Sequence, residues 1–155
     1  HATPVPPGVV IPPYQPYSLE LRRPPRWATR PEVWRRAIAV FDGPPPMMER
    51  SFIHRDYHPG NVLWSRGKVC GVVDWVNASV GVPEADVGHC RGNLTDRFGQ
   101  QAADRFLQLY QQVSGRRDYH PYWDIVAALG GLDESSDARP NLRDEDFLAT
   151  AVSAL

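Results

Sequence analysis

The sequence predicts an α+β domain in which helices predominate, and three observations support this fold class. Apolar residues recur at helical spacing in several segments, most clearly over residues 31–41 and 98–113. Short strand-like runs occur in the middle of the chain, between residues 51 and 74. The order is therefore one helix, a small β unit, and then a block of helices, which is typical of α+β domains and not of alternating α/β sheets.

Length and charge limit the classes of protein to which the chain can belong. It has 155 residues and a formal net charge of −1, which suits one domain with its own core. The nearly neutral balance argues against a nucleic-acid partner held by phosphate contacts. No apolar run is long enough to span a bilayer. We therefore expect no nucleic-acid and no membrane partner.

Cysteine usage indicates a reducing compartment. The chain contains two cysteines, Cys70 and Cys90, too few for a disulfide framework. Cys70 lies in an apolar run, so we expect it to be a small core residue. A cytoplasmic location is the resulting expectation.

Residues 1–30 form a proline-rich segment, which we expect to be extended because proline fixes φ and removes a hydrogen-bond donor. The segment could be a linker, or a strap that lies over the domain formed by residues 31–155. Its apolar side chains favour the strap: Val9, Val10, Ile11, Tyr14 and Tyr17.

The first helix is predicted over residues 31–41. Pro31 suits the first turn, and Gly43 with the prolines after it ends the helix. Further helices are expected from Pro83 to about Asn93, from a cap at Thr95 or Asp96 to Gly115, over 121–129, and over 144–155.

The β unit is predicted to contain a hairpin. Strand-like runs cover Ser51–His54, Val62–Trp64 and Val69–Asp74. Residues 65–68 supply a turn between the last two, so we expect those two strands to pair.

Polar side chains gather within and after the turn-rich segment between the first two strands. Asp56 and Asn61 are separated by four residues, and Pro59 with Gly60 lets the chain fold back between them. Asp74 ends the next apolar run, a common place for a functional group held by a rigid element. Two carboxylates and one amide oxygen are hard donors that suit Mg²⁺ better than zinc.

Three short sequence motifs carry a resemblance to a known family: "HRDYHPGN" (residues 54–61), "GVVDW" (71–75) and "GVPEADVG" (81–88). Together they resemble the aminoglycoside phosphotransferase family, which belongs with choline kinases to the protein-kinase-like superfamily. The resemblance extends from about Trp27 to the C-terminus. It implies the C-terminal lobe of a kinase-like fold, with a small catalytic β unit among helices.

The resemblance also implies roles for individual residues. Asp56 would accept the proton of the acceptor's hydroxyl, while Asn61 and Asp74 would hold Mg²⁺ beside the phosphates of ATP or GTP. His54, His58 and Asp86 would support the loop, although His58 could instead lie near the metal site. For Asp86, an ordinary acidic residue in the first turn of a helix is nearly as good an explanation.

Residues that could recognise the acceptor are less well defined. Trp123 and Asp124 could line an acceptor pocket, although a Trp at helical spacing is more often part of a core. Six acidic residues near the end could attract a polycationic aminoglycoside, but a solvated helix end is the favoured interpretation. These are Asp133, Glu134, Asp137, Asp144, Glu145 and Asp146.

The sequence also departs from the family. It contains no Gly-x-Gly-x-x-Gly, and Lys68, its only lysine, follows the catalytic loop instead of preceding it. We therefore expect the N-terminal nucleotide-binding lobe to lie outside these residues, and little activity from them alone.

Two other classes of function stay open. One is a non-catalytic remnant that binds a metabolite or forms a homodimer through the exposed face of the lobe. The other is a metal-dependent phosphohydrolase, which fits less well because such enzymes draw on more ligands.

Overall fold

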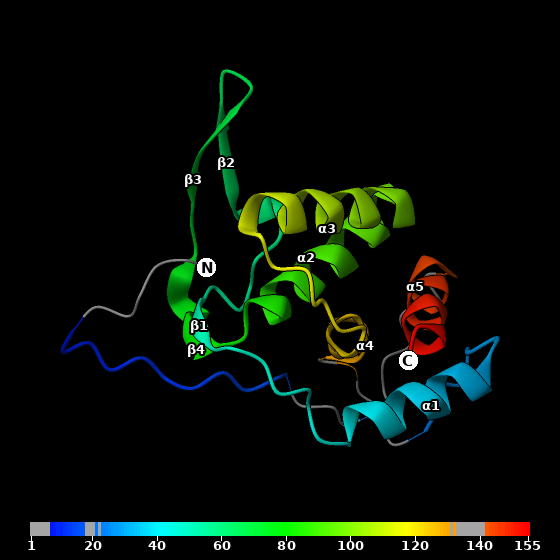
Figure 1. The fold of residues 1–155 in the computed structure, drawn as a ribbon. Helices are drawn as coiled ribbons and strands as arrows, with labels where there is room; N and C mark the ends of the chain where they lie inside the picture. Colours follow the sequence, from blue (N-terminus) through cyan, green and yellow to red (C-terminus); the bar gives the residue numbers. More distant parts are fainter. Residues whose placement is uncertain (1–6, 18–20, 22, 131, 133–141) are drawn as a thin grey trace.

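The computed structural model describes residues 7–17, 21, 23–130, 132 and 142–155, and in them helices predominate (Figure 1). The short strands lie between α1 and α2, so the predicted α+β fold class is confirmed. The elements are α1 (Pro31–Phe41), β1 (Ser51–Ile53), η1 (Pro59–Asn61), β2 (Val62–Ser65), β3 (Lys68–Val72), η2 (Trp75–Asn77), β4 (Ser79–Gly81), α2 (Pro83–Phe98), α3 (Gln100–Ser114), α4 (Tyr122–Leu129) and α5 (Leu142–Ser153), where η denotes a 3₁₀ turn.

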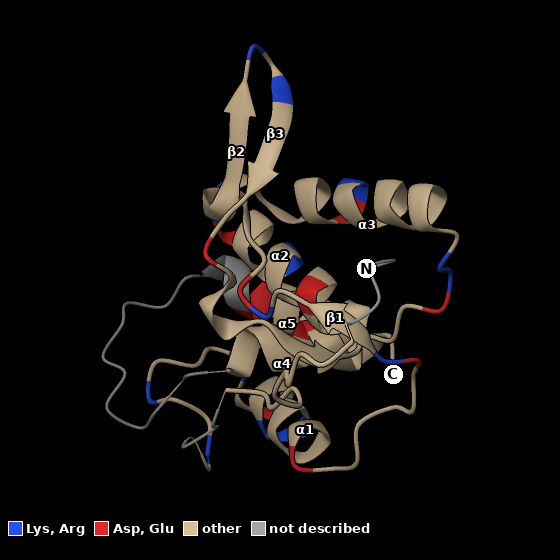
Figure 2. Ribbon diagram, turned by 90° about the vertical axis from the view of Figure 1, so that its left-hand side faces the viewer, with Lys and Arg blue, Asp and Glu red and all other residues tan. Residues whose placement is uncertain are grey.

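The predicted hairpin is present and projects from the body of the domain (Figure 1). β2 and β3 pair antiparallel from Val62 opposite Val72 to Ser65 opposite Lys68. Arg66 and Gly67 form the tip, and both have positive φ, as two-residue hairpin turns require. The tip carries basic residues, shown in blue in Figure 2.

A second small sheet was not predicted. β1 pairs antiparallel with β4, which has only the three residues Ser79–Gly81. So short a strand cannot display a period-two pattern, and the sequence therefore gave no sign of it.

Part of the proline-rich segment lies against this second sheet. Pro13 forms a parallel bridge with Val80. The N–H of Tyr14 donates to the carbonyl of Val80, and the N–H of Val80 donates to the carbonyl of Pro12, both at 2.9 Å. A Cβ at Gly81 would lie 2.5 Å from the Cβ of Tyr14, so only glycine permits this approach. The described part of the segment therefore lies along the domain.

Two apolar clusters share α4. Leu21, Trp34 and Leu148 pack with Ile125 and Leu129 of α4 in the first cluster. The second cluster lies beside β1 and the start of α2, and it contains Ile53, Val82, Ala85, Tyr122, Trp123 and Val126. α4 thus links the α1–α5 layer to the base of the small sheets.

A glycine allows α2 to cross α4 at close range. A Cβ at Gly88 would lie 2.4 Å from the carbonyl oxygen of Trp123, closer than real side chains come. This crossing fixes the position of α2 against α4. It therefore also fixes the positions of Asp86 and His89, on either side of Gly88, relative to the β unit.

Three sequence-based expectations are wrong. Thr95 and Asp96 do not cap a helix, because α2 runs on to Phe98 and the chain breaks at Gly99, whose φ is 89°. β3 ends at Val72 instead of Asp74. Cys70 is exposed and not in the core, because the hairpin projects and the start of β3 is solvated.

The acidic residues near the end do not all face solvent. Residues 133–141 lie outside the described part of the chain, but Glu145 is only 2% exposed. Its carboxylate accepts the backbone N–H groups of Thr29 and Arg30, the Thr29 hydroxyl and the Trp34 indole N–H. Burial raises the pKa of Glu145, but these donors outweigh burial and lower it. Glu145 therefore anchors the start of α1, where the helix dipole favours a negative charge.

Candidate active site

The loop of residues 54–61 connects β1 to β2, and its turn depends on one histidine and one glycine. Its 3₁₀ turn begins at His58, whose ring Nδ1 accepts the N–H of Gly60 at 3.0 Å. A Cβ at Gly60 would lie 2.7 Å from Cε1 of that ring. The His-Pro-Gly sequence therefore folds back on itself, and His58 stabilises the turn.

Asp86 holds the start of the loop. It is 1% exposed, and its two carboxylate oxygens accept the backbone N–H groups of His54, at 2.7 Å, and Arg55, at 2.6 Å. Burial raises the pKa of Asp86, and the two backbone donors offset part of that rise. These bonds tie the loop to α2 at the point where Arg55 takes a positive φ of 71°.

Asn61 links the loop to the segment that carries Asp74. Its side-chain amide donates to the carbonyl of Asp56 at 3.0 Å, and its own carbonyl accepts the N–H of Val73, also at 3.0 Å. The amide nitrogen is thereby used within the fold, so Oδ1 is the atom of Asn61 suited to a cation.

Asp74 lies one residue beyond that link. It is exposed and adopts the left-handed conformation, with φ 67° and ψ 53°. On either side the backbone is held: Nε2 of His54 lies 2.8 Å from the carbonyl oxygen of Val73, and Trp75 stacks on Phe52 with ring centroids 5.4 Å apart. The Asp74 carboxylate is therefore presented from a fixed turn.

Asp56 lies between two histidines. Its Oδ1 is 3.1 Å from Nε2 of His89 and 3.8 Å from Nε2 of His58, so only His89 is within hydrogen-bonding distance. Burial lowers the pKa of His89, although Asp56 partly offsets the shift. A neutral His89 can donate Nε2–H to Asp56 and fix one of its two oxygens.

His89 is a site residue that sequence reasoning missed. A signal was available, because His89 follows Asp86 by three residues on one helix, and residues at that spacing share a face. Once Asp86 was expected beneath the loop, His89 was the next side chain on the same face.

The oxygen donors of this site suit Mg²⁺. Asn61 Oδ1 and the Asp74 carboxylate belong to segments joined by a direct backbone hydrogen bond. Among the described residues, no group of three or more His, Cys, Asp or Glu side chains could hold a metal ion. Mg²⁺ typically takes one or two protein carboxylates together with substrate phosphates, so a cage made only of protein is not required.

Trp123 and Asp124, which could line an acceptor pocket, are both buried. The carboxylate of Asp124 is 2.9 Å and 3.2 Å from the guanidinium of Arg91 and accepts the Tyr119 hydroxyl at 2.5 Å. Trp123 is 5% exposed, and its indole nitrogen faces the sulfur of Met48 at 3.4 Å. Both side chains have partners inside the fold, which favours a structural role, and their contact with an acceptor stays a prediction.

Comparison with known proteins identifies the family to which the chain belongs. The model of the phosphotransferase enzyme family (APH) matches residues 13–129, which include the loop, the hairpin and α2. The chain belongs to the phosphotransferase enzyme family.

The individual proteins that match the chain are similar to it only in part of their length or at low sequence identity. The uncharacterized protein YcbJ of Bacillus subtilis (strain 168) is 36% identical over 67 residues, which are 43% of this chain and 21% of that protein. The crystal structure of a thermostable mutant of aminoglycoside phosphotransferase APH(4)-Ia, apo form, is 18% identical. That match covers 79% of this chain and 42% of the other, with a TM-score of 0.48. The chain thus spans less than half the length of either protein.

None of the helices in the described residues has the length and apolar character needed to span a bilayer.

Proposed function

We propose that these residues form the catalytic lobe of an ATP- or GTP-dependent phosphotransferase that acts on a hydroxyl group of a small molecule. One observation carries the proposal. The Asn61 side chain donates a hydrogen bond to the Asp56 carbonyl, and the N–H of Val73 donates to the Asn61 carbonyl. Since Asp74 follows Val73 directly, these two bonds hold the segments that carry Asp56, Asn61 and Asp74 together. Phosphoryl transfer depends mainly on such positioning and on charge neutralisation.

Asp56 acts as the proton acceptor. His89 holds Oδ1, and within the described part of the chain no side chain bonds to Oδ2. The free oxygen is therefore the atom that orients the acceptor's hydroxyl and takes its proton. The hydroxyl oxygen attacks the γ-phosphorus as the bond from that phosphorus to the nucleoside diphosphate breaks. Holding one oxygen fixes the direction of the other, which keeps the hydroxyl in line with the phosphate.

Asn61 and Asp74 hold Mg²⁺ beside the nucleotide. The bound ion supplies charge neutralisation for the phosphate oxygens. The left-handed conformation of Asp74 and the hydrogen bond from the Asn61 side-chain amide to the Asp56 carbonyl limit the positions that the Asp74 carboxylate and Asn61 Oδ1 can take.

An NMR experiment that uses paramagnetic relaxation by Mn²⁺ tests the metal site directly in this chain. Mn²⁺ added with ATP in place of Mg²⁺ should broaden the amide resonances near Asn61 and Asp74, because a paramagnetic ion relaxes nearby nuclei. Asp74→Asn should remove the effect and Asp118→Asn, an exposed Asp elsewhere, should not. Broadening that ignores Asp74→Asn, or that centres elsewhere, would contradict the assignment.

Turnover by these 155 residues alone should be negligible. They contain no glycine-rich loop, and Lys68 lies on β3, after the loop, so the groups that cover the nucleotide are not among them. An assay of ADP release with Mg²⁺–ATP should give rates near background. Rates similar to those of complete kinases would overturn this part of the proposal.

For the acceptor we propose an aminoglycoside-type molecule, and with it a cytoplasmic role in antibiotic resistance. This part of the proposal rests on the family match. A panel of aminoglycoside, macrolide, choline and homoserine probes tests it, because only the aminoglycoside should shift resonances around Asp56.

A second candidate is a non-catalytic binding or dimerisation module. Exposed apolar side chains on β2, β3 and η2 favour it, namely Leu63, Trp64, Val69, Trp75 and Val76. Sedimentation separates the two. A homodimer dispersed by Trp64→Glu, combined with no Mn²⁺–ATP effect at Asp74, would favour the module over the phosphotransferase.

A further inference from the structure

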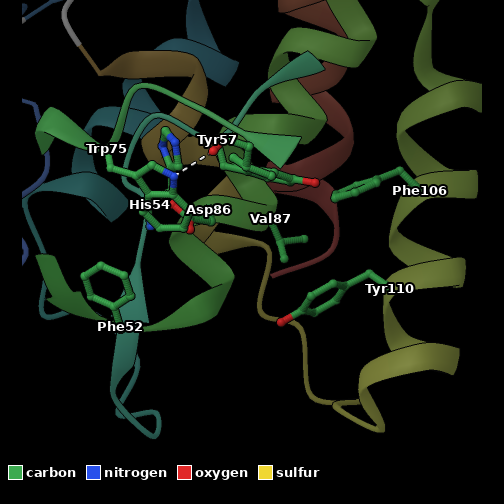
Figure 3. A pocket seen from close by; sticks show the side chains of 9 residues that line it. Phe52, His54, Tyr57, Trp75, Asp86, Val87, Phe106 and Tyr110 are labelled. Carbon is green, nitrogen blue, oxygen red and sulfur yellow. Dashed lines mark hydrogen bonds between the residues drawn. The ribbon is translucent and has the colours of Figure 1, made fainter. Parts of the chain in front are cut away.

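We propose that the aromatic pocket behind the 54–61 loop binds a small, neutral, planar molecule that carries one N–H or O–H donor. The pocket has a volume of about 290 Å³ and lies between the β unit and α3 (Figure 3). The inference does not depend on the proposed phosphoryl transfer, because Asp56 and Asp74 are not part of the lining.

The pocket has two aromatic walls on separate elements. Phe52 of β1 and Trp75 of η2 form one wall, stacked with an angle of 5° between their ring planes. Phe106 and Tyr110 of α3, one helical turn apart, form the facing wall, and Val87 of α2 lies between the walls (Figure 3). Aromatic side chains therefore line both sides of the pocket, and such a lining favours a flat guest, which can stack on the rings or meet them edge to face.

The size of the pocket sets the size of the guest. Ligand pockets usually range from about 300 to 1,000 Å³, and an apolar cavity of about 150 Å³ holds benzene. A volume of about 290 Å³ therefore suits one or two fused rings.

His54 contributes to the lining a residue with a buried polar atom that has no partner among the described residues. Its Nε2 lies 2.8 Å from the carbonyl oxygen of Val73, which can only accept, so Nε2 carries the proton. In the neutral ring Nδ1 is then an acceptor. His54 is 2% exposed, and Nδ1 has no partner among the described residues. A buried acceptor without a partner is costly, and a donor on the guest removes that cost.

The charge of the lining favours a neutral guest over an ion. Asp86 is the one acidic residue of the lining, and its carboxylate repels anions. Both of its oxygens already accept backbone N–H groups of the loop, so an organic cation would meet a carboxylate engaged elsewhere.

The test uses indole as the probe and the whole 155-residue chain. Indole should cause saturable shifts of the amide resonances of Phe52, Val87 and Tyr110. Benzofuran has the same shape but no N–H, and it should bind at least about tenfold more weakly because Nδ1 then stays without a donor. Bound indole should also move the Nδ1 nitrogen resonance of His54 toward that of a protonated nitrogen.

Two matched variants on α3 locate the site. Phe106→Trp enlarges a lining side chain and should weaken indole binding at least about tenfold, whereas Leu109→Trp, on an exposed position outside the lining, should not. Amide spectra of both variants check that the fold is kept.

Several results would overturn the proposal. These are no saturable shift up to the solubility of indole, equal binding of indole and benzofuran, equal effects of the two α3 variants, or tighter binding of benzyltrimethylammonium than of indole. The last result would assign the pocket to organic cations instead.

Discussion

The acidic residues of the 54–61 loop and its neighbours differ from those of the helical body in what their oxygens contact. In the helical body, the carboxylate oxygens of Asp124 and Glu145 accept hydrogen bonds from partners within the fold. At the loop, Asp56 has one oxygen held by His89, and Asp74 is exposed at a turn. The comparison teaches that unused hydrogen-bonding capacity of a carboxylate, and not a motif-like position alone, is the property to expect of a functional acid.

The backbone shows the same division. In the described residues, positive φ occurs at non-glycine residues only at Arg55, Arg66 and Asp74, all within the β unit. In the helical body, it occurs at Gly99 and Gly115, where it costs little. Two of these three conformations, at Arg55 and Asp74, thus lie at the candidate site, which is common for functional segments.

The largest expected effect is at the Arg91–Asp124 pair in the helical body. Asp124→Ala should lower the free energy of unfolding by about 3–5 kcal/mol, because it leaves the Arg91 cation buried without its main partner. Urea denaturation measures the loss. Asp104→Ala removes the exposed partner of the same guanidinium and should cost less than about 1 kcal/mol. Equal losses would show that burial does not separate these two acids.

Glycine positions on α2 come next. Gly88→Ala should destabilise by about 1–3 kcal/mol, because the new methyl would lie 2.4 Å from the Trp123 carbonyl oxygen. Gly92→Ala, four residues on, meets its nearest atom at 3.6 Å and should stabilise by about 0.5–1 kcal/mol through helix propensity. Thermal unfolding of both variants checks the opposite signs.

At Asp74, one substitution should raise the stability of the fold and remove metal binding. Asp74→Gly should raise the free energy of unfolding by up to about 1 kcal/mol, because glycine adopts φ 67° without the cost of a side chain. The same change should abolish the Mn²⁺–ATP broadening. Arg66→Gly at the hairpin tip, also at positive φ, should give a similar gain and keep the broadening. A large loss of stability in Asp74→Gly would mean that the carboxylate is structural after all.

The smallest expected effect is a pH dependence from His89. Its pKa is lowered by burial, so between the unfolded value of about 6.5 and the lower folded value the unfolded chain binds more protons. Stability from this group is therefore present at neutral pH and is lost as the pH falls through that window. The difference in unfolding free energy between about pH 7.5 and about pH 5.5 should be smaller in His89→Asn than in the original chain, by no more than about 1.4 kcal/mol for each unit of pKa shift. An unchanged difference would remove His89 from the pH response.

What the sequence predicted well is local. α1, α4 and the hairpin follow from short patterns and end near the expected residues, and the spacing of Asp56 and Asn61 fits the turn between them. What it missed depends on distant partners. Glu145 meets residues 115 and 116 positions away, and Asp124 meets Arg91 from another helix. A side chain's burial and its partners across the fold are decided by packing, which no window of sequence displays.

The β2–β3 hairpin has one further consequence for how this lobe tolerates change. Asn61 and Asp74 flank its base, where the bond between Val73 and Asn61 adds one more rung below the Val62–Val72 pair. Their separation is therefore set by the width of a strand pair and not by the number of residues in between. Insertions or deletions of residue pairs near Arg66 should lengthen or shorten the projecting arm while leaving the two oxygen donors in place.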